Sequence, residues 1–528
     1  MKKTSYQLLV ALMGVVLGIL ISVLFFRVTT ARKKQMSWEY GNWRKLSLIL
    51  DYVENHYVDT IDVKNMTDAA VAAALHELDP HSVYLPPVEL EESESELAGN
   101  FDGIGIQFNV PNDTAIILSV IGGGPSEKAG LMQGDRIIRV DEKVIAGAKT
   151  PQDSMVRLMK GPSGSKVKVT VLRGEETIAF DITRGKIPVN CVDAAFMVND
   201  ATGYIKLTKF TRTTYSEVQV SALMLLAQGM KKLIFDIRGN TGGYFEQACL
   251  LANEFLERGD QVVYMEGLHS PRRDFKADGR GMLKNVELCV LIDESSASSS
   301  EIFAGAIQDN DRGMIIGRRS FGKGLVQEPL NFTDGSGIRL TIARYYTPSG
   351  RCIQKPYTSG DEYEYDIYER YVHGEMTDVD SIKVNENEVY YTAKGRKVYG
   401  GGGIIPDVFV TMDTTKATNF YVQCNRKATA MRFASNFFDQ HRNELSNIDD
   451  YAVLDAFIRK QDLESKFLSF AASRDGLKPS SAEWQESKAY MMPQVNALVA
   501  RYSKLGENAF YKMYLDIDEC VKKALTAR

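Results

Sequence analysis

The fold of the chain is decided by two stretches, Asp293-Glu-Ser-Ser-Ala-Ser-Ser-Ser-Glu301 and Ser320-Phe-Gly-Lys-Gly-Leu-Val-Gln327. An apolar run typical of a buried strand, Val286 to Asp293, precedes the serines. An apolar helical pattern follows them from Ser299. The sequence therefore predicts a strand-to-helix turn in an α/β core, and such a turn would expose the Ser298 side chain.

The pairing of Ser298 with Lys323 indicates nucleophilic chemistry. A serine hydroxyl attacks a carbonyl well only when a neighbouring base takes its proton. None of the six histidines lies near Ser298 in the sequence, whereas burial can lower the pKa of a lysine from about 10.4 towards neutrality. The amide groups at the start of the following helix would stabilise a tetrahedral oxyanion.

Two other interpretations of the same residues remain open, and a third is disfavoured. Ser298 or Ser299 can cap the helix, with Glu301 completing a capping box. The Gly-Lys-Gly around Lys323 can be a turn with a solvated lysine. The run from Gly317 to Lys323 also matches the start of a phosphate-binding loop, but Gly324 stands where that loop needs Ser or Thr for magnesium.

These motifs resemble the signature of the carboxy-terminal processing peptidases, also called tail-specific proteases. The resemblance implies Ser298 as nucleophile, Lys323 as base and Gln327 as the residue that orients the lysine. Ser299 replaces a more usual alanine, and only its N–H would be needed. The run Asp236-Ile-Arg-Gly-Asn-Thr-Gly-Gly243 resembles the family's oxyanion turn, which assigns Gly242 or Gly243 to the oxyanion hole together with the N–H of Ser299.

Residues 101–187 combine alternating strand patterns with glycine turns and resemble a PDZ domain over their whole length. Such domains add a peptide as an extra strand and hold its terminal carboxylate in backbone amides. The resemblance places the carboxylate loop at Gly103, Ile104, Gly105 and Ile106, and Leu158 on the helix beside the side-chain pocket.

The remaining regions are assigned mainly by pattern. Residues 38–100 are expected to be mostly helical, with a loop around His81 that resembles a family motif and is interpreted as structural. Residues 188–412 form the α/β peptidase core, interrupted by a polar excursion at 356–400 and closed by Gly402-Gly-Ile-Ile-Pro-Asp407. Residues 413–528 show helical periodicity. For this last region, packing onto the peptidase body, homo-oligomerisation and substrate docking all remain open.

The N-terminus predicts a membrane anchor. Leu8 to Phe26 carries no charge, is long enough to span a bilayer and is flanked by lysines and arginines. We expect residues 1–34 to be an uncleaved signal anchor with a transmembrane helix at 8–26, and a cleaved signal peptide is the alternative. The family resemblance implies a single-pass protein of the inner (plasma) membrane, with most of the chain on the periplasmic or extracytoplasmic side.

Composition limits the other function classes. The formal net charge of −5 gives no electrostatic case for nucleic-acid binding. The six cysteines are widely spaced without metal-ligand spacing, so they are expected to be mostly free buried thiols, and neither a metal nor a cofactor is implied.

The predicted fold is thus an α/β protease core with an inserted β-rich PDZ domain, an N-terminal transmembrane helix and helical N- and C-terminal regions. The predicted function is a serine endopeptidase that cleaves proteins with apolar C-terminal tails after the PDZ domain binds those tails. A catalytically silent PDZ scaffold or adaptor at the membrane is the alternative.

Overall fold

The computed structural model describes residues 41–111, 113–357, 360–413 and 417–527, which belong to two units. The first unit ends at Glu77 and contains α2 (Gly41–His56) and α3 (Val63–His76), which confirms the helical pattern predicted for this part of the chain. Among the described residues no helix combines the length and apolar character needed to cross a membrane. The predicted transmembrane helix at 8–26 lies outside the described residues.

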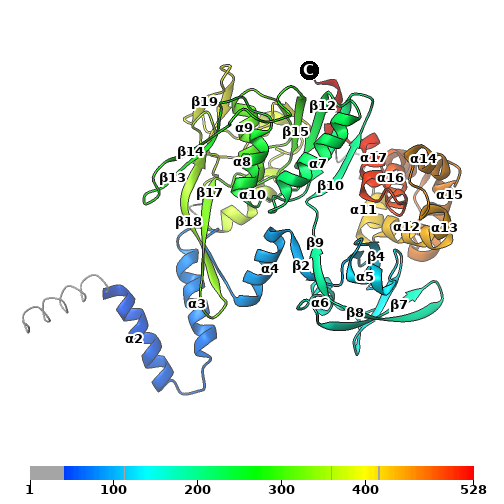
Figure 1. The fold of residues 1–528 in the computed structure, drawn as a ribbon, viewed down its shortest axis with the longest axis horizontal. Coiled ribbons are helices and arrows are strands. Elements are labelled where there is room, and N and C mark those ends of the chain that lie inside the picture. Colours follow the sequence, from blue (N-terminus) through cyan, green and yellow to red (C-terminus); the bar gives the residue numbers. More distant parts are fainter. Residues whose placement is uncertain (1–40, 112, 358–359, 414–416, 528) are drawn as a thin grey trace, which may run out of the picture. The chain divides into compact units, whose positions relative to one another are not determined.

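The second unit, from Leu78 onward, is built on a six-stranded sheet (Figure 1). Its strands, in spatial order, are β10 (Val192–Met197), β11 (Thr202–Leu207), β12 (Lys232–Asp236), β15 (Glu287–Ile292), β16 (Met314–Gly317) and β21 (Val408–Phe409). The β10–β11 pair is antiparallel and the other pairs are parallel. Parallel strands rich in Val, Ile and Leu are expected to be buried on both faces, and β12 is buried along its whole length.

Helices cover both faces of this sheet. Phe235 and Val290 point to one face and share a core with α7 (Thr214–Ala227), α8 (Phe245–Asn253) and α9 (Ser299–Asp309). Ile234 and Leu291 point to the other face and share a core with α18 (Glu519–Thr526). The predicted α/β class is therefore confirmed, and the C-terminal helix supplies the second covering layer.

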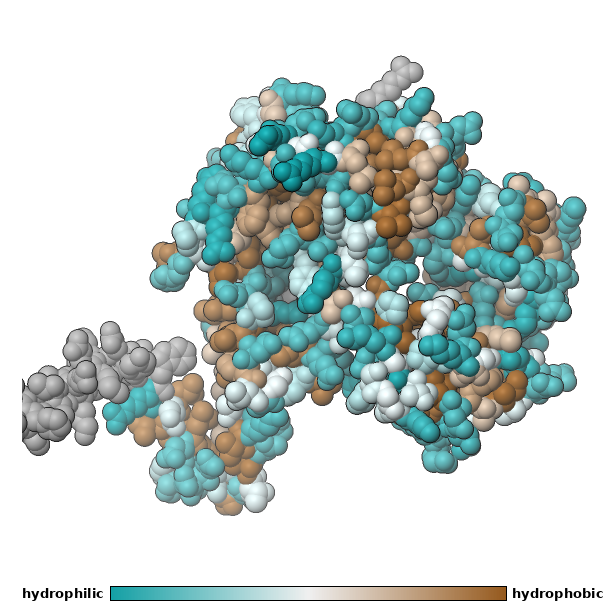
Figure 2. Space-filling view, in the orientation of Figure 1, coloured by the Kyte–Doolittle hydropathy of each residue, from teal (hydrophilic) through white to brown (hydrophobic). Residues whose placement is uncertain are grey.

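The outer side of α7 carries an exposed apolar strip. Val220, Leu223 and Met224 are each more than half exposed, and Figure 2 shows apolar atoms gathered over this helix. Their spacing of three to four residues places them on one helix face. This face is therefore left uncovered by the described residues.

A second sheet lies beside the first and positions one of the candidate residues. It contains β1 (Val83–Leu85), β18 (Gly337–Tyr346), β13 (Gln261–Glu266) and β14 (Arg273–Lys276), and β17 (Leu325–Asn331) also pairs with β18. The β17–β18 pair is antiparallel, with Gln327 opposite Thr341. Lys323 lies just before β17 and Gln327 lies within this strand, so the two residues are close together at its start.

The PDZ region and the C-terminal bundle each have a core of their own. The PDZ sheet has the order β3 (Ile106–Asn109), β4 (Ala115–Val120), β5 (Arg136–Val140), β7 (Lys166–Arg173), β8 (Glu176–Thr183), with α6 (Gln152–Met159) as its longer helix. Helices from α11 (Asn419–Arg426) to α16 (Ser481–Ala500) enclose the second core. An ion pair of 2.5 Å joins Arg136 of β5 to Asp439 of α12 (Thr429–Gln440). The C-terminal region therefore packs partly on the PDZ domain and, through α18, partly on the peptidase sheet.

Candidate active site

Ser298 lies at the turn between β15 and α9, in a strained backbone conformation. Its φ of 56° and ψ of −114° are rare for a residue with a side chain, and such strain costs about 1–3 kcal/mol. Strain of this kind often accompanies function. Among the described residues no hydrogen bond uses the Ser298 hydroxyl as a donor, whereas the Ser298 N–H donates to Glu301 Oε2 at 2.9 Å as part of a capping box. Glu301 thus supplies its half of the capping box and leaves the hydroxyl available.

The other serines of the run fasten this turn to the glycine turn after β12. Ser296 Oγ donates to the Ile237 carbonyl at 2.9 Å, and Ser299 Oγ donates to the Gly243 carbonyl at 2.9 Å. Ser300 Oγ donates to the Asn240 carbonyl at 2.8 Å. These three hydroxyls are engaged in structure, which distinguishes Ser298 from Ser296, Ser299 and Ser300.

Lys323 is held by a chain of side-chain contacts. Its Nζ donates to Gln327 Oε1 at 3.1 Å, and Gln327 Nε2 donates to the His81 carbonyl, which fixes the orientation of the amide. Burial, followed by the positive charge of Arg339, lowers the pKa of Lys323 below its usual value. A lysine with a lowered pKa has a larger neutral fraction and can accept a proton near neutral pH.

Ser298 and Lys323 face the same cavity, which has a volume of about 780 Å³. The predicted residues Gln327, Ser299, Gly242 and Gly243 line it too. Its apolar wall consists of Phe245, Met265, Phe275, Ile302, Leu325 and Val326. The structure therefore brings every catalytic and oxyanion candidate from the sequence to one cavity, while their roles remain predictions.

The two oxyanion candidates, Gly242 and Gly243, differ in their N–H groups. The Gly242 N–H donates to Asn240 Oδ1 at 2.9 Å and is therefore engaged. Among the hydrogen bonds of the described residues, none uses the N–H of Gly243 or of Ser299. A Cβ on Gly242 would lie 3.0 Å from the Ser299 nitrogen, so the two turns approach closely. The geometry favours Gly243 with Ser299.

Glu301 links the Ser298 turn to the loop that carries Lys323, a role that the sequence did not reveal. Besides the Ser298 N–H, its carboxylate accepts from the N–H of Lys323 at 2.8 Å, the N–H of Gly322 at 2.7 Å and Ser320 Oγ at 2.5 Å. Its side chain is completely buried, and this burial raises the pKa of Glu301 to about 7. The loop amides that resemble a phosphate site thus bind an internal carboxylate.

His81 contributes through its position. Burial and then the Lys323 charge lower the pKa of His81 to about 4, so the ring is neutral at physiological pH. Its Nε2 is 2.5 Å from the Tyr363 hydroxyl, and its carbonyl holds Gln327. The sequence-based interpretation of His81 as structural is compatible with these contacts. The contribution of its carbonyl could not be seen from the sequence.

The predicted peptide-binding residues lie in the PDZ region. Gly103 ends β2 (Asn100–Gly103), Ile106 begins β3, and none of the hydrogen bonds among the described residues uses the N–H of Ile104 or Gly105. Leu158 lies on α6 and packs against the PDZ core. These positions leave two amides for a carboxylate.

Comparisons with known proteins identify the two modules. Residues 201–364 match peptidase family S41, residues 103–183 match the PDZ domain, and residues 420–503 match a family of unknown function. A solved photosystem II D1 C-terminal processing protease is 27% identical, with a TM-score of 0.38, over 71% of this chain and 88% of that one.

Two curated relatives match longer parts of the chain. The carboxy-terminal processing protease CtpA of Bacillus subtilis is 31% identical over 61% of this chain and 69% of its own length. A probable CtpA-like serine protease of Staphylococcus aureus is 32% identical over 60% of this chain. The match spans 63% of the length of that relative. The resemblance seen in the motifs is thus confirmed, and the chain belongs to the carboxy-terminal processing proteases of peptidase family S41.

Proposed function

We propose that this chain is a serine endopeptidase of the C-terminal processing type. Neutral Lys323 takes the proton of the Ser298 hydroxyl as Ser298 Oγ attacks the substrate carbonyl. The N–H groups of Gly243 and Ser299 stabilise the oxyanion. Lys323 then gives the proton to the leaving amine, and water attacks the acyl-enzyme with Lys323 again as base.

The convergence of Ser298 and Lys323 on one cavity carries this proposal. Ser298 has the strained turn and the uncommitted hydroxyl, and Lys323 has the lowered pKa and the fixed partner Gln327. A silent PDZ scaffold would need neither a buried lysine nor a strained serine. A strained backbone and a buried lysine both cost stability. They persist only where the surrounding structure holds them in place, as it often does at functional sites.

The substrate and the location form the second part of the proposal. Substrate proteins with apolar C-terminal tails would bind the PDZ domain through Gly103, Ile104, Gly105 and Ile106, with Leu158 beside the side-chain pocket. The apolar run at 8–26 would anchor the chain in the inner membrane, with most of it outside the cytoplasm. Protease accessibility in intact and permeabilised cells tests that topology, and ultracentrifugation tests for a homo-oligomer.

The activity is tested on full-length protein with a model substrate that ends in an apolar tail, followed by intact mass. We expect processing to stop in Ser298→Ala and Lys323→Ala and to continue in Ser295→Ala, a control from the same serine run. Processing that survives Ser298→Ala would show another nucleophile. Tail binding without processing by any form would favour the scaffold.

A further inference from the structure

The loop that carries Lys323 has a partner for every peptide group from Ser320 to Lys323. Its N–H groups donate to Ile404, Ser296 and, twice, Glu301. Its carbonyls accept from two Arg370 nitrogens, the Lys355 N–H and the Tyr345 hydroxyl. Because an unpaired buried backbone group costs about 1–3 kcal/mol, this complete pairing keeps the loop closed.

Arg370 provides two of these four carbonyl contacts from outside the peptidase sheet. It lies on α10 (Gly360–Val372), within the polar excursion that precedes the closing motif. Its two terminal nitrogens donate to the Ser320 carbonyl at 2.8 Å and the Phe321 carbonyl at 3.1 Å. The residue is only 4% exposed, and Asp366 balances its charge at 2.9 Å. The planar guanidinium presents several donors in a fixed geometry, which suits two successive carbonyls.

A second set of contacts joins α10 to the same lysine. Lys355 Nζ lies 4.0 Å from the ring centres of both Phe321 and Tyr363. The Tyr363 hydroxyl contacts His81, whose carbonyl holds the Gln327 amide that accepts from Lys323. Residues of the excursion therefore contact the backbone of the lysine loop directly. Through His81 they also support Gln327, the side chain that accepts from Lys323 Nζ.

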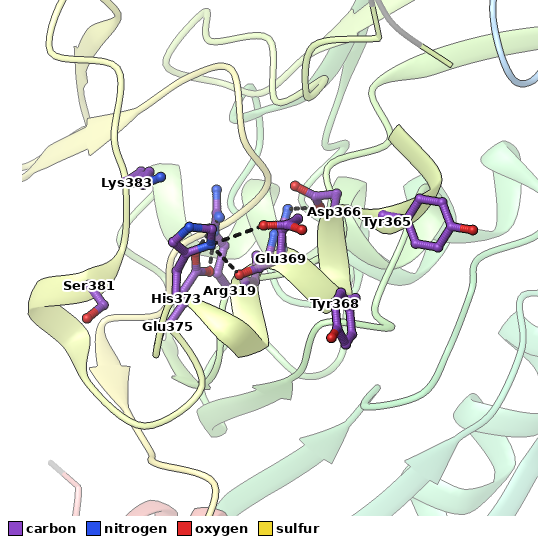
Figure 3. A pocket seen from close by; sticks show the side chains of 10 residues that line it. Arg319, Tyr365, Asp366, Tyr368, Glu369, His373, Glu375, Ser381 and Lys383 are labelled. Atoms are coloured by element: carbon purple, nitrogen blue, oxygen red, sulfur yellow. Dashed lines mark hydrogen bonds and ion pairs between the residues drawn. The ribbon is translucent and has the colours of Figure 1, made fainter. Parts of the chain in front are cut away.

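A cavity of about 600 Å³ lies on the outer side of this cluster. Figure 3 shows the side chains that line it. There Arg319, which precedes the loop, forms a bidentate pair with Glu375 at 2.5 and 2.6 Å. His373 and Glu369, 3.4 Å apart, lie farther out, and both are more than half exposed. Residues of α10 that do not touch the lysine loop are thus available as controls.

We propose that Arg370 is a positioning residue for Lys323, through which α10 holds the lysine loop in place. The inference rests on the proposed function, because it concerns the geometry of that function's base. Without Arg370, two buried carbonyls would seek water, and the loop would open locally. Water beside Nζ would favour the charged lysine and raise the pKa of Lys323. The titratable or charged groups that face Lys323 are Glu301 on α9, Asp79 and the neutral His81 in the loop before β1, and Arg339 on β18.

The test compares Arg370→Gln, Arg370→Lys and the control Glu369→Gln in the full-length protein. Amide hydrogen exchange of residues 319–325 should accelerate in Arg370→Gln, less in Arg370→Lys, and remain unchanged in Glu369→Gln. The kcat of Arg370→Gln should fall about 100-fold, the loss expected from a small displacement of a catalytic group, with little change in KM. The rise of kcat with pH should also shift to higher pH.

Normal exchange at 319–325 together with normal kcat in Arg370→Gln would overturn the inference. Loss of protection throughout the β12 sheet in Arg370→Gln would mean that this variant is misfolded. In that case the hydrogen exchange of residues 319–325 and the kcat of Arg370→Lys decide instead. If even the unmodified protein fails to process the substrate, the proposed function fails while the exchange comparison still tests the contact. Faster exchange confined to 319–325 then supports the positioning role, and unchanged exchange refutes it.

Discussion

The Glu301→Gln substitution tests the link between the nucleophile and the lysine loop. Glutamine has one oxygen and one NH₂ in place of two oxygens. With the NH₂ at the Oε2 position it would face the N–H groups of Ser298 and Lys323, leaving two donors unpaired at a cost of about 2–6 kcal/mol. With the NH₂ at the Oε1 position it would face the Gly322 N–H and the Ser320 hydroxyl.

The second orientation is the less costly one. The Ser320 hydroxyl already accepts from the Ile404 N–H at 2.6 Å and has a further lone pair for the new NH₂. The Gly322 N–H then stays unpaired, at a cost of about 1–3 kcal/mol, and the Ser320 O–H, which donated to Glu301 Oε1, has to turn to another acceptor. If this cost falls on the transition state, kcat decreases between about 5-fold and about 150-fold.

The same geometry predicts a pH dependence. Burial raises the pKa of Glu301 to about 7, so below this pH a growing fraction of the carboxyl is protonated. A protonated carboxyl has one O–H that, like the NH₂ of glutamine, cannot accept from the amides. The ratio of wild-type kcat to Glu301→Gln kcat should therefore fall as pH decreases through 7.

Steady-state processing assays between pH 5.5 and about 8.5 measure this ratio. Glu294→Gln is the matched control, because Glu294 neighbours the same turn but pairs with Arg318 at 2.8 Å. It should leave kcat nearly unchanged. Wild-type kcat in Glu301→Gln at every pH would refute the bridging role.

Three further substitutions test other contacts. Arg339→Gln removes a charge that lowers the pKa of Lys323, so the rise of kcat with pH should move to higher pH; an unchanged profile would exclude this coupling. Gly242→Ala places a methyl group 3.0 Å from the Ser299 nitrogen, at a φ of 102°, and should lower kcat by roughly 10²–10³-fold with tail binding retained. Asp518→Asn weakens the 2.6 Å pair with Arg238 and should cost about 1.5–3 kcal/mol, seen as faster hydrogen exchange in α18; equal exchange would count against it.

The sequence predicted the elements around the site because their patterns are local. The apolar run at 286–293 corresponds to β15, and the serine run was placed at the turn that follows it. The contacts made by Ser296, Ser299 and Ser300 could not be predicted, since their acceptors lie some sixty residues earlier. The sequence indicated only a helix cap for Glu301, because its other partners, Ser320, Gly322 and Lys323, are not local in the sequence.

The C-terminal region shows the same limit on a larger scale. Helical periodicity predicted helices after residue 413, and the structure contains them. Periodicity shows that a helix has an apolar face but not what covers that face. Val521 of α18 packs on the peptidase sheet, whereas Asp439 of α12 pairs with Arg136 of the PDZ domain. The two halves of one helical region therefore have different partners.

The electrostatics around Lys323 explain how this lysine could serve as the proposed base without a histidine. Burial and Arg339 lower the pKa of Lys323, while Glu301 and Asp79 raise it. Glu301 opposes the shift only when ionised, and its own pKa lies near 7. Ionisation of Glu301 therefore raises the pKa of Lys323 and partly offsets the effect of burial. The ionised Glu301 that favours the charged lysine also holds the Lys323 N–H. The same carboxylate that fixes the position of Lys323 therefore also raises the pKa of Lys323 and reduces its neutral fraction.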